Sequence, residues 1–238
     1  MIFCIIGFFN WKGCVNMKKN NAKKLAIMGC FCAIAYICVF VFRIKVSFLT
    51  FDAKDAVIAV CALLYGPVAG VSVSAVTSIL EFLTVSDTGV YGLIMNIIST
   101  TAFILPVSII YKLRKNTTGA ISGLIVSVFS VAAVMLCANL LITPYYMGVS
   151  IEDVKGILLP LILPFNATKA VLNGALTMII YKPIVNALRS TGLVEAGNKK
   201  YNLNKKTIII LVCSAVLAAV AIIVLTLSLG GVFEIIRK

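Results

Sequence analysis

Long apolar runs separated by short polar segments dominate this chain. Seven runs are continuous enough to form helices, and most approach the roughly 20 residues that cross a hydrocarbon core about 30 Å thick. The predicted spans are residues 25–42, 56–65, 68–83, 91–111, 119–142, 157–185 and 207–229. Spans two and three are short and meet at Gly66-Pro67, so we expect them to form an irregular hairpin. The pattern predicts an all-α integral membrane protein embedded in the lipid bilayer.

Composition supports a membrane protein and removes several kinds of chemistry. The 238 residues are 61% hydrophobic and 12% charged, with a mean hydropathy of +1.10, which excludes a water-soluble fold. Because the chain has no histidine, it cannot use a histidine base, a Ser-His or Cys-His pair, or a His-ligated zinc ion. Six of the eight cysteines fall within predicted spans, where we interpret them as small buried residues.

The net charge of +13 is arranged in short basic clusters between the spans, as the positive-inside rule describes. Of the 21 Lys and Arg residues, Lys169 lies within a span and six lie on one side: Arg43, Lys45, Lys54, Lys155, Arg237 and Lys238. The other 14 lie on the side of the N-terminus. This asymmetry predicts a multi-pass protein of the cell membrane with a cytoplasmic N-terminus. Nucleic acid is not expected as a partner, because the pattern forms no basic surface interleaved with aromatic residues.

These segments divide the chain into four parts. Residues 1–16 form an apolar extension too short to span a membrane, and residues 17–190 hold six spans. Residues 191–206 form a basic cytoplasmic linker, and residues 207–238 hold an additional hydrophobic helix and a tail. Met17 opens a Lys-rich lead typical of a cytoplasmic N-terminus, so we expect translation to start there.

Span six contains the most informative polar residues. A lysine inside a membrane span costs at least a few kcal/mol unless it is paired, so Lys169 is a candidate functional residue. Asn166 lies three residues earlier and therefore on the same helix face. Pro160 and Pro164 each remove a backbone N–H donor, and we expect them to bend the helix and open a polar cavity near its outer end. The alternative is a Lys169 that snorkels or is paired for structural reasons.

Other polar residues fall near the outer ends of the same spans. Asn139 precedes the end of span five by about one turn, Asn96 follows the start of span four by about one turn, and we expect the first outer loop, 48–52, to fold across the mouth of the cavity. Several amides and one cation ringed by aromatic residues suit a flat, polar-edged, uncharged or weakly anionic aromatic ligand. For any single Asn, interhelical hydrogen bonding is the alternative. Asp52 and Asp55 resemble a carboxylate pair for metal binding or acid/base work, but they stand where span two begins, and we interpret one or both as helix N-caps.

Span one carries a stripe of small residues, and the chain carries no nucleotide motif. Ala26, Gly29, Cys30 and Ala33 would let another helix approach closely, either within this chain or from a partner. No Gly-x-x-x-x-Gly-Lys-Ser/Thr phosphate loop occurs. Any transport would therefore draw its energy from ions or from a partner subunit.

Together these segments resemble the riboflavin-specific substrate-binding (S) component of the energy-coupling-factor (ECF) vitamin importers. The resemblance covers residues 18–182 and rests on motifs in colinear order. They are Phe-Leu-Thr-Phe-Asp-Ala-Lys-Asp at 48–55, Tyr-Gly-Pro-Val-Ala-Gly at 65–70, Thr-Gly-Val-Tyr-Gly-Leu-Ile-Met-Asn at 88–96, Leu-Pro at 105–106, Thr-Pro-x-Tyr at 143–146 and Pro-Phe-Asn-x-x-Lys at 164–169.

The resemblance implies a fold, a ligand and partners. The fold is a six-helix S-component bundle, here with an extra C-terminal transmembrane helix outside that pattern. The bundle binds its vitamin near the outer face and joins a membrane coupling subunit that carries two cytoplasmic ATPases. Riboflavin is then the transported ligand, and no cofactor, metal or catalytic residue is expected.

It also implies roles for individual residues. Asn139, Asn166 and Lys169 would bind the pyrimidine edge of the isoalloxazine ring. The rest of the site would cover the ring or meet the ribityl hydroxyls, and comprises Leu49, Thr50, Phe51, Thr88, Tyr91 and Asn96. The small residues of span one, Ala26, Gly29, Cys30 and Ala33, correspond to the surface that docks on the coupling subunit.

Three other functions are compatible with a polytopic membrane protein. An S component for another vitamin or small heterocycle differs only in its ligand. A secondary transporter is disfavoured because no internal repeat is evident and intramembrane acids are scarce. An integral-membrane enzyme is disfavoured because the spans show no acid pair, histidine or nucleophile constellation.

Overall fold

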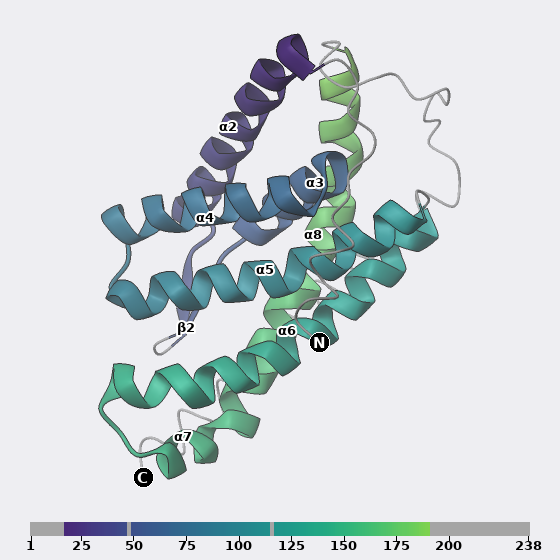
Figure 1. The fold of residues 1–238 in the computed structure, drawn as a ribbon. Helices are drawn as coiled ribbons and strands as arrows, with labels where there is room; N and C mark the ends of the chain where they lie inside the picture. Colours follow the sequence, from purple (N-terminus) through teal and green to yellow (C-terminus); the bar gives the residue numbers. More distant parts are fainter. Residues whose placement is uncertain (1–16, 47–48, 115–116, 191–238) are drawn as a thin grey trace.

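The computed structural model describes residues 17–46, 49–114 and 117–190, which form a bundle of helices with one short strand hairpin (Figure 1). The elements are α2 (Met17–Val41), β1 (Ile44–Val46), β2 (Leu49–Phe51), α3 (Lys54–Tyr65), α4 (Pro67–Thr84), α5 (Gly89–Leu113), α6 (Thr117–Met147), α7 (Ile151–Ile157), the π-helical segment η1 (Leu158–Ile162) and α8 (Leu163–Ser190). Within the described residues, five helical stretches are long and apolar enough to cross a membrane. The predicted all-α membrane class is therefore confirmed.

The predicted spans and parts can be compared with the helices of the described residues. Each of the first six predicted spans coincides with a helical segment of the described chain. The N-terminal extension 1–16, the linker 191–206 and the additional helix and tail 207–238 lie outside the described residues.

Helix α3 lies at the centre of the bundle. Residues 54–63 are all buried, and α3 packs against α2, α4, α5 and α8. Its 12 residues extend about 18 Å, which is shorter than a hydrocarbon core. The continuous apolar sequence of α3 therefore reflects burial by protein on every side rather than a complete membrane span.

The predicted hairpin between spans two and three is present as the α3–α4 turn. Gly66 adopts a φ of 92°, and Pro67 occupies the first turn of α4, so α3 must end at Tyr65. Gly70 then lets the two helices cross closely, because a Cβ atom there would lie 2.6 Å from the Cβ of Ala62.

The segment before α8 is irregular, in agreement with the bend predicted from Pro160 and Pro164. Ser150 caps α7, and its hydroxyl accepts the N–H of Asp153. The π-helical segment Leu158–Ile162 follows and contains Pro160, which has no N–H to donate. This irregular stretch leads directly into the part of α8 that carries the polar residues.

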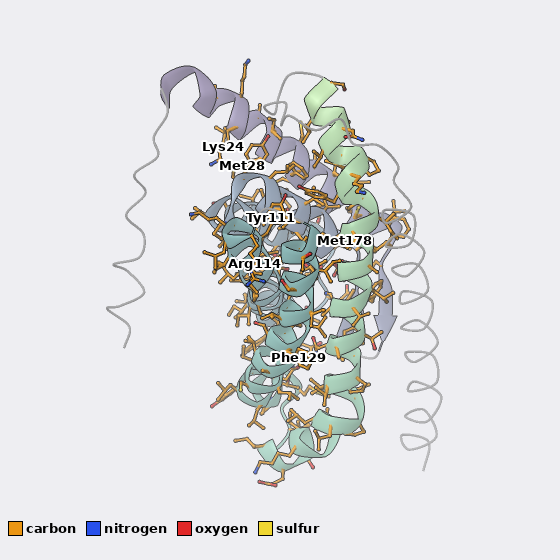
Figure 2. The ribbon with its side chains drawn as sticks, turned by 90° about the vertical axis from the view of Figure 1, so that its right-hand side faces the viewer. Lys24, Met28, Tyr111, Arg114, Phe129 and Met178 are labelled. Atoms are coloured by element: carbon orange, nitrogen blue, oxygen red, sulfur yellow. The ribbon has the colours of Figure 1, made fainter. Side chains whose placement is uncertain are left out.

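A strand hairpin that the sequence pattern did not predict links α2 to α3. β1 and β2 pair antiparallel, with Ile44 opposite Phe51 and Val46 opposite Leu49. Figure 1 shows that α2 begins and α8 ends at one end of the bundle, while α7 lies at the other. In Figure 2, Lys24 of α2 lies toward the end where α8 finishes, and Phe129 of α6 lies farther toward α7.

Candidate ligand-binding site

A cavity lies between segments that are far apart in the sequence. It is enclosed by β2, the end of α4, the first half of α5, the last turns of α6 and the first turns of α8. These segments meet because successive antiparallel helices return alternate ends to the same side of the bundle. The polar residues noted near the outer ends of the spans are thereby brought together.

The structure brings eight of the nine residues predicted for the ligand to this cavity. They are Leu49, Thr50, Thr88, Tyr91, Asn96, Asn139, Asn166 and Lys169. Phe51 does not line it, and instead packs in a cluster with Leu161, Phe165 and Leu172. Phe51 supports the wall of the cavity from behind because β2 lies against α8. The binding role of the eight lining residues stays a prediction.

The two buried asparagines that line the cavity make similar hydrogen bonds. The Nδ2 of Asn139 donates to the Met135 carbonyl at 2.8 Å, and the Nδ2 of Asn166 donates to the Ile162 carbonyl at 2.8 Å. The Oδ1 of Asn139 accepts a hydrogen bond from the Thr143 hydroxyl at 2.9 Å. Each side chain is thus held in place by a backbone carbonyl one turn earlier, with few rotamers left to lose when a ligand binds.

Lys169 is both paired and part of the cavity lining. Its residue is 6% exposed, and its Nζ donates to Asp52 Oδ2 at 3.0 Å and to the Thr50 carbonyl at 3.3 Å. Asp55 Oδ2 lies 3.9 Å from the same nitrogen. These acceptors compensate the cost of burying the ammonium group. The sequence left open whether Lys169 is a site residue or is paired for structural reasons. In the structure it is paired and also lines the cavity.

The prediction that Asp52 and Asp55 cap a helix is wrong. The N-cap of α3 is Ala53, and no side-chain cap bond is made there. Asp52 accepts the Lys54 backbone N–H at 3.3 Å but directs its other oxygen to Lys169. Burial disfavours the charged form of Asp52, but Lys169 and Lys54 outweigh burial and hold the pKa of this carboxyl below its usual range.

Asn173 joins this ionic pair to the start of α3. Its Nδ2 donates to the Asp52 carbonyl at 3.1 Å, and its Oδ1 accepts the Ala56 N–H at 3.0 Å. Sequence analysis missed Asn173, although its position four residues after Lys169 places it on the same helix face. The segment between the hairpin and α3 is therefore bonded to α8 at two successive turns, by Lys169 and by Asn173.

Three further charged residues near the site were also missed. Lys54 is fully buried and forms an ion pair with Glu81, which lines the cavity from α4. Arg43 also lines the cavity and donates from its guanidinium to the Val85 carbonyl at 2.7 Å. In the sequence Arg43 and Lys54 border apolar spans and served only as markers of topology, whereas Glu81 lies inside the third predicted span and was not singled out.

The small residues of span one occupy a different surface. Ala26, Gly29, Cys30 and Ala33 are all exposed on α2, and no atom lies within 4 Å of a Cβ built on Gly29. Of the two alternatives from the sequence, packing within the chain is not observed for the described residues. An exposed stripe of small residues on a membrane helix is suited to a close contact with another helix.

The fold and the cavity define a class: a polytopic helical membrane protein with a polar-lined cavity between its helices. The family model for the ECF transporter substrate-specific component matches residues 23–181. The chain therefore belongs to the family of ECF transporter substrate-specific components.

Individual relatives agree with this assignment. The chain is 29% identical over 185 residues to the riboflavin transporter RibU of Staphylococcus aureus (strain TCH60), covering 74% of this chain and 96% of the relative. It is 28% identical over 185 residues to the riboflavin transporter FmnP of Bacillus subtilis (strain 168), covering 71% and 97%. A solved structure of the S component of a bacterial ECF transporter superposes with a TM-score of 0.62 at 26% identity, covering 71% of this chain and 98% of that one.

Membership of this family decides between the classes that the sequence left open. The chain is a component of a transporter and not an enzyme. It is also the substrate-specific part of a larger assembly rather than a self-sufficient secondary transporter.

Proposed function

We propose that this chain is the riboflavin-binding subunit of an ECF importer. It captures the vitamin at the outer face of the cell membrane and delivers it through a coupling subunit powered by two separate ATPases. The observation that carries the proposal is the convergence of Asn139, Asn166 and Lys169 on one cavity. The names of the relatives, both riboflavin transporters, support the same ligand.

The polar atoms at the cavity match the pyrimidine edge of the isoalloxazine ring, which presents a carbonyl, an N–H and a carbonyl in a row. An ammonium group has three donor hydrogens, and Asp52 and Thr50 accept two of those of Lys169. The third is donated to a ring carbonyl while the ion pair stays intact. Asn166 uses its Nδ2 for a backbone carbonyl, which leaves its Oδ1 to accept the ring N–H.

The part of the cavity formed by α5 suits the ribityl chain. Thr88, Tyr91 and Asn96 present a hydroxyl, a phenol and an amide, which exchange hydrogen bonds with the sugar-alcohol hydroxyls. The rings of Tyr91 and Tyr146 lie with centroids 6.1 Å apart and form an aromatic border between α5 and α6. Riboflavin is the transported ligand in this proposal, and no cofactor is required.

The distribution of charge supports the orientation. Lys23 and Lys24 near the start of α2, and Lys112 and Arg114 near the end of α5, lie on the side of the bundle away from the cavity. The positive-inside rule favours a cytoplasmic location for this side, which supports a cytoplasmic N-terminus and a cavity that opens toward the outside.

A binding measurement tests the ligand directly. We expect the protein purified in detergent to quench the fluorescence of added riboflavin with saturation at a 1:1 ratio, because aromatic residues enclose the ring. A heterocycle without the carbonyl, N–H, carbonyl edge should not compete. If folded protein fails to quench riboflavin but binds another vitamin, the alternative of an S component with a different ligand is correct.

Reconstitution in liposomes tests whether this chain only binds riboflavin while other subunits drive its uptake. The chain alone in liposomes should bind riboflavin but show no ATP-dependent uptake, because its sequence contains no phosphate loop. Addition of an ECF coupling subunit and its two ATPases should restore uptake. Concentrative uptake by the lone chain under a proton or sodium gradient would contradict the proposal.

A further inference from the structure

Lys169 stands between the cavity and two carboxylates. Its Nζ is 3.0 Å from Asp52 Oδ2 and 3.9 Å from Asp55 Oδ2, and the lysine itself lines the cavity. Both carboxylates are buried, at 1% and 3% exposure. The positive charge of Lys169 at the cavity wall is therefore balanced by the buried carboxylates of Asp52 and Asp55, which lie on the side of the lysine away from the cavity.

The other charged groups around Lys169 do not cancel the negative charge of Asp52 and Asp55. Lys54 pairs with Glu81, and its Nζ lies 3.9 Å from the same Asp52 oxygen that binds Lys169. Counting Asp52, Asp55 and Glu81 against Lys54 and Lys169, the buried cluster has one more carboxylate than ammonium group. The remaining ionisable groups that line the cavity are Arg43, Tyr91 and Tyr146.

We propose that Asp52 is a specificity-determining residue that makes this site select a ligand with a neutral hydrogen-bonding edge. The inference rests on the proposed function, since it concerns the edge of riboflavin that meets Lys169. A bare lysine in a buried site attracts anions, whereas a lysine neutralised by Asp52 acts as a hydrogen-bond donor to an uncharged carbonyl. Asp52 thus acts through Lys169 and does not itself line the cavity.

The ring N–H of riboflavin reports on this charge balance. It is a weak acid that loses its proton to water at alkaline pH, which leaves a negative charge spread over the two flanking carbonyl oxygens. An opposite charge at hydrogen-bond distance favours the anion, and a like charge behind it disfavours the anion. The pKa of the bound flavin therefore measures how completely Asp52 compensates Lys169.

The experiment follows the absorption spectrum of bound flavin against pH in the full-length protein. Asp52→Asn keeps the shape of the side chain but removes its charge, and we expect the pKa of the bound ring N–H to fall by about one unit or more relative to wild type. Asp55→Asn should lower it in the same direction by less, because Asp55 lies farther from Nζ. The matched control is Glu152→Gln, an exposed acid paired with Lys155 on α7, which should cause no shift.

The outcomes separate this inference from the proposed function. If wild-type protein binds no flavin, the proposed function fails. If Asp52→Asn and Asp55→Asn bind flavin with the wild-type pH profile, Asp52 has no role in charge selection and only this inference fails. Loss of all binding in both folded variants would also overturn it, because the carboxylates would then hold the site together rather than adjust its charge.

Discussion

Replacing Lys169 with Ala should weaken riboflavin binding and destabilise the protein at the same time. The affinity should fall by about 1–3 kcal/mol, because ligand carbonyl groups lose a buried hydrogen-bond donor. The folded state should lose about 3–5 kcal/mol as well, because Asp52 and Asp55 are left as buried carboxylates without their shared ammonium partner. Fluorescence titration measures the first effect, and thermal unfolding in detergent measures the second.

Asn166→Ala is the matched comparison for Lys169→Ala. Asn166 lines the same cavity, but its Nδ2 donates to the Ile162 carbonyl one turn earlier, in η1, and not to a carboxylate. Its loss should weaken binding by a similar amount, about 1–3 kcal/mol, while leaving the unfolding temperature close to that of wild type. Wild-type affinity in both variants would show that riboflavin does not bind at this wall of the cavity.

Bulky residues on the exposed face of α2 should abolish transport without affecting riboflavin binding. Gly29→Leu and Ala33→Leu fill a surface that is open in the described chain, so the fold and the cavity should be unaffected. A helix of the coupling subunit that packs against small residues would lose its close approach. Transport by the reconstituted complex and co-purification with the coupling subunit are the two measurements.

Val126→Leu is the control for the α2 variants. Val126 is 44% exposed on α6, so the substitution adds bulk to another exposed helix face and should leave transport unchanged. If Gly29→Leu instead lost riboflavin binding while assembly remained intact, the small residues of α2 would have a role in the ligand site and the docking surface would lie elsewhere.

The helices were predictable because they follow from local properties of the sequence. A run of apolar residues such as that of α5 becomes a helix in a bilayer, since lipid offers no partner for backbone N–H and C=O groups. The turn at Gly66-Pro67 was equally local, because a glycine with positive φ followed by proline ends one helix and begins the next.

Individual site residues were predictable because polar groups are costly inside a membrane. Asn139, Asn166 and Lys169 were conspicuous within apolar spans, and all three line the cavity. The predictions failed for charges outside those spans, and they also missed Glu81 and Asn173 inside them. Asp52 and Asp55 have the sequence position of helix caps, and nothing within their own segment shows that Lys169 and Asn173 lie next to them in the fold.

The sequence by itself determined the membrane class, the order of the helices and the chemical character of the residues that line the cavity. Tertiary structure alone decided that Lys169 is neutralised by Asp52, that Lys54 is buried against Glu81, and that Phe51 packs behind the cavity rather than within it. The physical reason is the sequence separation of the interacting residues. Helix formation depends on neighbours within a few residues, whereas the Lys169–Asp52 bond joins groups 117 residues apart, which only the packing of the strand hairpin against α8 brings together.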